Sequence, residues 1–266
     1  MKQPSIFLPH GGGPCFFMPA PVDDPERWVA LEGYLRDLPN QLPAKPDALL
    51  VISAHWEEER PTFLTGAAPN LFFDYYGFPP ATYQLTWPAP SAPALTAKAR
   101  DLLDKAGIDS GEDAGRGYDH GVFVPLKVAF PDAEIPVLQV SLQTGLDPEH
   151  HIAIGKALAP LRDDNVVVIG SGLSFHNLRA LGDHRADLPA EQFDDWLAEN
   201  LIGQPADRRE TALIEWAASP GGRIAHPREE HLLPLMVAAG AGHDAECRRT
   251  FSGKIWGKAV SAFQFG

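Results

Sequence analysis

Four short runs of apolar residues punctuate the chain. They are SIFLP (5–9), ALLVIS (48–53), PVLQVSL (136–142) and NVVVIG (165–170). Each run is continuous rather than alternating and contains many β-branched residues, which is typical of strands covered on both faces. The pattern therefore predicts four buried strands.

Amphipathic segments separate and follow these runs. We expect helices over 23–38, 91–107 and 147–161, two more around 190–217, and one over 228–239. Strands that alternate with helices predict a single α/β domain, with a central, mostly parallel sheet flanked by helices. The segments 62–66 and 83–87 and a tail around 248–265 are candidates for antiparallel edge strands.

Composition adds a size and a class to this picture. The chain has 266 residues, 44% of them hydrophobic, which suits a globular protein with a substantial core. The 26 prolines are dispersed, and we find neither an internal repeat nor a low-complexity tract. One domain over residues 1–266 is the simplest organisation.

Charge and cysteine content exclude several function classes. A net charge of −13 argues against binding to nucleic acid or to an anionic membrane, since both require a basic patch. No segment resembles a signal peptide or a membrane span. Two cysteines, Cys15 and Cys247, are too few for a disulfide framework or a thiolate zinc site. The default expectation is a cytoplasmic protein.

Histidines follow three of the predicted strands. His10 comes after 5–9, His55 after 48–53 and His176 after 165–170. Ligands of open α/β sheets bind at the carboxyl ends of the strands, so these three side chains are expected to share one crevice. His120 and His231 lie in comparable contexts, at a Gly-rich turn and at the mouth of a helix. For the other five histidines we expect structural or surface roles: His150, His151, His184, His226 and His243.

This arrangement favours a mononuclear metal site. Neutral imidazole binds iron, zinc, copper and nickel, and a catalytic metal needs about three protein ligands. Glycines 11–13, 170 and 172 would then clear space for a substrate. Competing motifs are weaker, because GSGLS (170–174) lacks the spacing of a nucleophile elbow and GGGP (11–14) lacks the phosphate-loop lysine. Cys15 is more naturally a small pocket-lining residue than a nucleophile.

Several motifs in register resemble a known family. They are LPHGGGP (8–14), ISAHWE (52–57), YDHGVFVPLKVAFPDAEIPVLQVSL (118–142), GSGLSFHNL (170–178) and EEHLLPLMVAAGAG (229–242). Together they resemble the class III extradiol ring-cleavage dioxygenases, the protocatechuate 4,5-dioxygenase catalytic-subunit superfamily, and within it the single-chain DOPA 4,5-dioxygenase-like branch. The resemblance extends over residues 5 to 260 and is specific for the superfamily but not for a substrate.

The resemblance implies roles for the five histidines. His10, His55 and His231 match metal ligands, His176 matches the active-site acid/base, and His120 matches a second pocket histidine. Protocatechuate-type enzymes have a glutamate as third ligand, so a shift of register toward Glu229 or Glu230 is the alternative to His231. His176 is also a possible additional ligand when substrate is absent.

The implied activity is the opening of a catechol-type ring by O2 at a non-haem Fe(II) ion. Because three histidines form a neutral ligand set, Zn(II) is a possible occupant of the same site. The partners would be a small catecholic substrate and O2. Two rivals remain: a zinc hydrolase that uses the same histidines, and a non-catalytic metal-binding relative.

Side chains around the histidines are assigned from the motifs alone. Tyr118, Phe16, Phe17 and Trp56 are candidates for an aromatic pocket wall, with ordinary core packing as the alternative. Arg116 and Lys127 flank the YDHG motif, and we expect both to be solvated surface charges.

Overall fold

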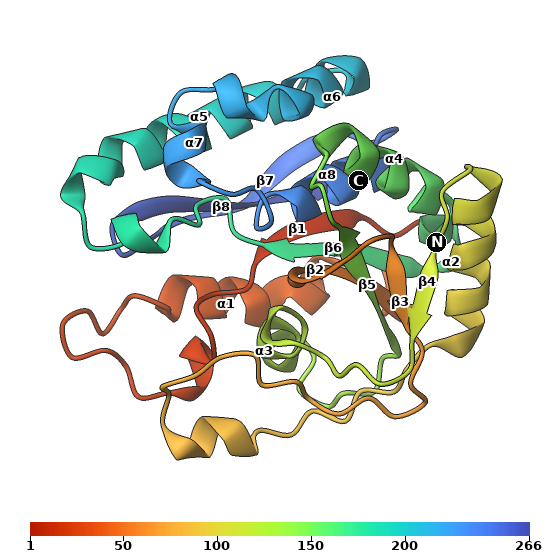
Figure 1. Cartoon of the computed structure of the whole chain (residues 1–266). Helices are drawn as coiled ribbons and strands as arrows, with labels where there is room; N and C mark the ends of the chain where they lie inside the picture. The colour runs from red at the N-terminus through yellow and green to blue at the C-terminus, as the bar shows by residue number, and fades with distance from the viewer.

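The four predicted strands form the centre of one sheet (Figure 1). In the computed structural model, which describes residues 1–266, they are β1 (Ser5–Pro9), β2 (Ala48–Glu58), β5 (Val137–Gln143) and β6 (Val166–Gly172). They lie in the order β5-β2-β6-β1, and every neighbouring pair is parallel. Almost every residue in them is buried, as continuous apolar runs require. The predicted α/β architecture is confirmed.

Shorter strands extend this sheet to eight strands, in the order β4-β3-β5-β2-β6-β1-β8-β7. The segment 62–66 gives β3 (Thr62–Leu64), antiparallel to β5, and the tail gives β7 (Cys247–Ile255) and β8 (Lys258–Phe265), which pair antiparallel. These two predictions are confirmed. A short β4 (Gly111–Asp113), not predicted, pairs parallel with β3.

The predicted edge strand over 83–87 is wrong. The chain forms a 3₁₀ turn over Pro80–Gln84 instead, closed by a bond from the Thr82 N–H to the Pro79 carbonyl at 2.9 Å. Prolines 79, 80 and 88 flank the segment. Proline has no N–H to donate to a sheet and favours turns, so the alternating side chains at 83–87 did not indicate a strand.

Helices cover both faces of the sheet (Figure 1). One face carries α1 (Val29–Asp37) and α3 (His120–Ala129); the other carries α4 (Pro148–Leu158) and α8 (Leu233–Ala241). The remaining helices are α2 (Pro93–Lys105), which packs on α4, α5 (Asp187–Leu201), which packs on β8, α6 (Ala206–Ile214), which packs on α4 and α8, and α7 (Gly222–Ala225), which packs on α5. No helix combines the length and the apolar character that a bilayer crossing requires.

Two helices begin later than predicted. The segment 23–38 becomes helical only at Val29, because the preceding residues form successive turns, such as the bond from Arg27 N–H to the Asp24 carbonyl at 3.2 Å. The segment 228–239 becomes helical at Leu233. In α8 every residue is buried, so it is apolar on all sides.

Helix α3 was not predicted, and its sequence explains why. HGVFVPLKVA is buried almost all round, so it has no polar stripe, and it contains Pro125. Proline removes the N–H that would bond the carbonyl four residues earlier, which is that of Gly121. The Ser171 hydroxyl, on β6, donates to this carbonyl instead. A side chain from the sheet thus satisfies the carbonyl that Pro125 leaves free.

Candidate metal and active site

Three neighbouring strands, β2, β6 and β1, present their carboxyl ends side by side. His10 follows β1 directly, and its N–H donates to the Gly172 carbonyl at the end of β6, at 3.1 Å. His55 lies on β2 where pairing with β5 changes register between Ile52 and Glu57. Such an irregularity bends a strand and redirects a side chain. The strand ends thereby point both imidazoles to one place.

His231 reaches the same place from the segment before α8. The N–H of Leu173 donates to the His231 carbonyl at 3.0 Å, which fixes this segment to the end of β6. A Cβ atom on Gly170 or Gly172 would collide with the Pro234 or the His231 carbonyl, respectively. These glycines therefore admit the backbone that carries His231, and not a substrate as expected from the sequence.

The glycines after His10 also make room for protein side chains. A Cβ on Gly11 would collide with Cys15 Sγ, and one on Gly13 would come within 2.8 Å of the Phe78 ring. Both glycines have positive φ angles, of 87° and 52°, which other residues rarely adopt. Glycines 11–13 do line the cavity. The backbone conformation and the packed side chains around Gly11 and Gly13 nevertheless explain why these positions are glycine.

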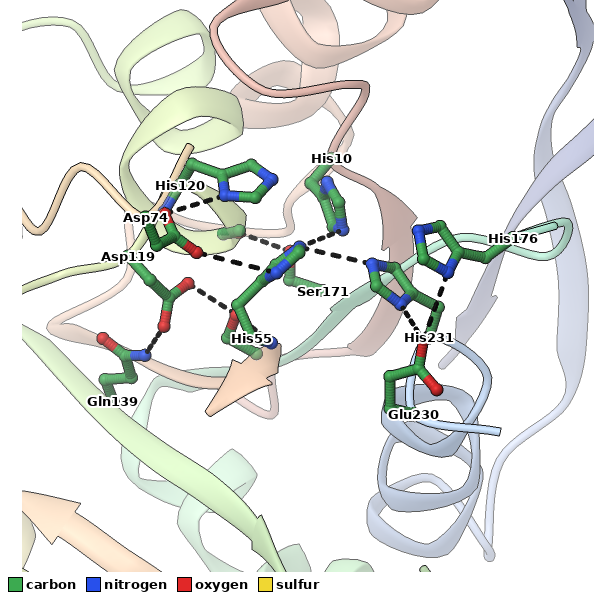
Figure 2. Close-up of polar contacts among 12 residues, drawn as sticks. His10, His55, Asp74, Asp119, His120, Gln139, Ser171, His176, Glu230 and His231 are labelled. Atoms are coloured by element: carbon green, nitrogen blue, oxygen red, sulfur yellow. Dashed lines mark hydrogen bonds and ion pairs between the residues drawn. The ribbon is translucent and has the colours of Figure 1, made fainter. Parts of the chain in front are cut away.

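The imidazoles of His10, His55 and His231 converge on one point (Figure 2). His55 Nε2 lies 3.2 Å from His10 Nε2 and 3.2 Å from His231 Nε2. One nitrogen from each ring lies within 4.8 Å of the others. His10 and His231 are buried and His55 is 20% exposed, so three potential metal-ligating nitrogens meet in a site that is largely shielded from solvent.

The protein environment keeps these rings neutral. Burial first, and then the neighbouring histidines, hold the pKa values of His10 and His55 well below the ordinary value of 6.5. Burial also lowers the pKa of His231 to about 3, although the bond to Glu230 opposes the shift. Neutral imidazole is the form that binds a metal ion.

Asp74 serves two of the site histidines. Its Oδ1 accepts from the His120 backbone N–H at 2.9 Å and from His120 Nδ1 at 2.8 Å, and its Oδ2 lies 3.6 Å from His55 Nδ1 (Figure 2). A carboxylate at Nδ1 favours the tautomer with the proton there, which leaves Nε2 with its lone pair. Sequence reasoning missed Asp74; its only signal is an acidic residue within the aromatic segment LFFDYY (71–76).

Glu230 is the carboxylate that contacts two other site histidines, His231 and His176. Its Oε1 lies 2.9 Å from His231 Nδ1 and 3.2 Å from His176 Nδ1 (Figure 2). Burial alone would raise the pKa of Glu230, but the bonds from His176 and His231 hold it well below its usual range. Glu229, the other residue in the register alternative, pairs with Arg223 at 2.7 Å. Glu230 thus contacts both imidazoles at their Nδ1 atoms.

His120 and His176 flank the three converging rings. The His120 ring centroid lies 3.9 Å from that of His55, and the His176 ring stacks on His231 at 3.3 Å with an interplanar angle of 15°. In Figure 2 the second nitrogen of His176 points away from Glu230. All five predicted histidines therefore line one cavity.

That cavity has a volume of about 190 Å³ and a largely apolar wall. The aromatic residues that line it are Trp28, Phe175 and Trp256, none of which was predicted. The four predicted ones do not line it. Tyr118 is fully buried and donates to the Val137 carbonyl at 3.0 Å, Trp56 donates to Glu58 at 2.8 Å, and Phe16 and Phe17 pack against the core.

Arg116 is not the solvated charge that was expected. Its side chain is 16% exposed, and its Nη2 donates to the His55 carbonyl at 3.0 Å and to Asp119 at 3.2 Å. Buried Asp119 also accepts from Ser53 at 2.6 Å and from Gln139. This network connects β2, β5 and the start of α3. Lys127 is half-buried, and its Nζ donates to the Thr86 carbonyl at 2.8 Å.

The histidines assigned structural roles stay outside the cavity. His226 is fully buried, with Nε2 3.0 Å from the Ser174 carbonyl, and burial lowers its pKa to about 3. His151 is buried and His150 partly exposed. Cys15 is buried, does not line the cavity, and has its pKa raised by burial to about 12, which does not suit a nucleophile.

Comparison with known proteins adds the family. Residues 6–261 match the model of the catalytic LigB subunit of aromatic ring-opening dioxygenase. A 4,5-DOPA dioxygenase extradiol from Portulaca grandiflora is 40% identical, over 90% of this chain and 86% of the relative. The dioxygenase TasH from Hapsidospora irregularis is 35% identical, over 99% of this chain and 85% of the relative.

A solved structure agrees with this match over the whole fold. The crystal structure of an uncharacterized protein from Escherichia coli K12 has a TM-score of 0.78 and 27% identity, and the match covers 100% of both chains. The 4,5-DOPA dioxygenase extradiol from the same organism is 32% identical over 90% of this chain and 85% of the relative. The chain belongs to the family of LigB-type catalytic subunits of aromatic ring-opening dioxygenases, the class III extradiol dioxygenases.

Proposed function

We propose that this protein opens a catechol-type ring with O2, outside the two hydroxyl groups, using one metal ion held by His10, His55 and His231. The observation that carries the proposal is the convergence of three neutral imidazoles, two of them buried and that of His55 20% exposed, each within 4.8 Å of the others at one nitrogen. The family assignment supplies the reaction class.

The donor set fits a divalent transition metal. An all-nitrogen set suits iron and also zinc, and three protein ligands leave positions open for small ligands. Glu230 lies at His231 Nδ1 and Asp74 near His55 Nδ1, so carboxylates orient two of the ligands from behind, as is usual for metal-binding histidines. We propose Fe(II) as the active metal, with Zn(II) as a possible occupant. Bound Fe(II) would supply the redox chemistry that lets O2 react with a catechol.

His176 is the proposed proton acceptor. With Nδ1 at 3.2 Å from the Glu230 carboxylate, its proton resides on that side, and Nε2 is free to take the proton of a catechol hydroxyl. The negative charge of Glu230 then stabilises the imidazolium that forms. The same ring afterwards returns the proton as a general acid.

His120 is the proposed hydrogen-bonding partner of the substrate. Its Nδ1 proton is held by Asp74 at 2.8 Å, so its Nε2 accepts a bond from a substrate hydroxyl. It sits at the first position of α3, where a helix N-terminus stabilises negative charge. A catecholate formed by loss of the hydroxyl proton would carry such charge.

The test is anaerobic reconstitution with Fe(II), followed by a panel of catechols and then air. The proposal predicts oxygen uptake matched one to one by substrate loss, together with a yellow ring-opened product. A zinc hydrolase would instead turn over an ester or amide with Zn(II) and consume no oxygen. A non-catalytic relative would bind the metal and show neither reaction.

A further inference from the structure

The cavity wall beyond the histidines carries no free charge. It is formed by aromatic and aliphatic side chains, among them Trp28, Phe175 and Trp256. The indoles of Trp28 and Trp256 meet edge to face, with centroids 5.1 Å apart. No carboxylate lines the cavity, and Lys258 is the only lysine or arginine that does.

Lys258 is already neutralised. Its side chain is 1% exposed, and its Nζ lies 2.5 Å from Asp187 Oδ1 and 3.2 Å from the Trp256 carbonyl. The guanidinium of Arg27 lies 4.9 Å from the Trp256 ring centroid, outside the cavity lining, and is held by Asp23 at 2.7 Å. A charged substituent on a bound ring would therefore lose water without gaining a partner, which costs free energy.

The cavity is large enough for one substituted ring. An engineered apolar cavity of about 150 Å³ binds benzene. At about 190 Å³ this cavity accepts a catechol ring with a short substituent. A longer substituent would pass Leu178, which lines the cavity and is 68% exposed at its mouth.

We propose that the substrate is a catechol whose ring substituent is apolar and uncharged, such as a short alkyl group, and not one that carries a carboxylate or an ammonium group. The inference deepens the proposed function and rests on it for the catechol itself. The selectivity follows from the wall, which offers apolar contact in place of ionic recognition.

Binding tests this separately from turnover. The protein is titrated, anaerobically, with para-ethylphenol and with para-hydroxyphenylpropionate, by calorimetry and by quenching of tryptophan fluorescence. The ethyl compound should bind at least about tenfold more tightly. Equal or tighter binding of the carboxylate would overturn the proposal. Loss of that binding in Lys258→Met would then assign carboxylate recognition to Lys258.

Turnover and a charge variant complete the test. With Fe(II) and O2, kcat/KM should be at least about tenfold higher for ethylcatechol than for dihydroxyphenylpropionate or dopamine. Leu178→Arg places a cation at the mouth and should shift the preference toward the propionate. Ile202→Arg, at a residue that is 41% exposed and does not line the cavity, is the matched control and should leave the preference unchanged. If no catechol reacts, the proposed function fails, while the binding preference still decides the nature of the wall.

Discussion

Two carboxylates lie close to the Nδ1 atoms of four of the site histidines. Asp74 serves His55 and His120, and Glu230 serves His231 and His176. Each carboxylate thus joins one proposed metal ligand to one histidine that is proposed to contact the substrate. The histidines could be predicted, because strand ends and motifs mark them. Their partners could not, because Asp74 comes from a distant loop that no spacing rule connects to the strand ends.

A ligand and a base respond differently to replacement by alanine. His176→Ala should keep close to wild-type iron and lose about a hundred- to ten-thousand-fold in turnover, the usual cost of removing an acid–base group. His231→Ala should instead lose the metal while remaining folded. Iron content and catechol turnover are measured on the same preparation. Parallel loss of both in His176→Ala would make His176 a fourth ligand.

The third ligand has its own control. Glu230→Ala removes the carboxylate at the Nδ1 atoms of His231 and His176, so, if His231 is the ligand, it should lower metal affinity by about ten- to a hundred-fold without abolishing binding. If His231→Ala keeps full metal and Glu230→Ala has none, the carboxylate is the ligand and the assignment of His231 is wrong.

Asp74→Asn tests the second carboxylate. The amide cannot balance a positive charge near His55 and His120, so metal affinity should fall about ten- to a hundred-fold. Asp109→Asn, at a carboxylate that is 77% exposed and pairs with Arg60, is the control and should bind metal as the wild type does. Unchanged affinity in Asp74→Asn would show that Asp74 does not support the site.

Individual elements differ in how visible they are from sequence. The parallel strands were predictable because burial on both faces produces continuous apolar runs. Helix α3 was not predicted, because a helix buried on all sides has no periodic stripe of polar residues and because it contains Pro125. The strand predicted over 83–87 was wrong, because apolar and polar residues alternate there between prolines that favour a turn over pairing with a neighbouring strand. In both failures a tertiary contact or a proline decided the local structure.

The contribution to stability of the hydrogen bond from Ser171 to the Gly121 carbonyl, which compensates for Pro125, can be measured. Ser171→Ala should destabilise the protein by about 1–3 kcal/mol, the cost of leaving the buried Gly121 carbonyl without a donor. Pro125→Ala restores a backbone N–H for that carbonyl, so in its background the same change should cost less than about 1 kcal/mol. Urea denaturation of the four proteins gives the cycle. Equal costs in both backgrounds would disprove the compensation.

On the scale of the molecule, the carboxyl ends of the central strands bring together site residues from distant parts of the chain. β2, β6 and β1 are adjacent in the sheet, although β6 is the sixth strand in sequence. The alternation of strands and helices predicts that the carboxyl ends of these strands meet at the same end of the sheet. The strand order and the cavity wall could not be predicted, because Trp28, Phe175 and Trp256 come from segments without a common motif.

Buried neutral histidines also make the whole fold sensitive to acid. His151, outside the site, has Nδ1 2.7 Å from the Asp147 carbonyl, and its Nε2 accepts from the Gln143 N–H at 3.1 Å. Burial lowers its pKa to about 4. Above about pH 6.5 the ring is neutral in both states. Between about pH 6.5 and 4 only the unfolded chain binds the proton, so stability falls as pH falls, by up to about 3 kcal/mol.

His151→Gln isolates this contribution. Free energies of unfolding of the metal-free proteins, measured by urea denaturation between about pH 7 and pH 4, should decline less steeply for the variant than for the wild type. The remaining decline reports the other buried histidines and the carboxylates whose pKa values the fold lowers, such as Glu230 and Asp183. Parallel curves would show that His151 titrates normally in the folded protein.

The most direct test of the central claim is the fate of molecular oxygen. The Fe(II)-loaded protein is mixed with a catechol under heavy-isotope O2, and the product is analysed by mass spectrometry. Extradiol cleavage at this site predicts a yellow, ring-opened product that carries both labelled oxygen atoms, and no such product from His176→Ala beyond a residual trace. An intact ring with one labelled atom, or product of unlabelled oxygen only, would contradict the account.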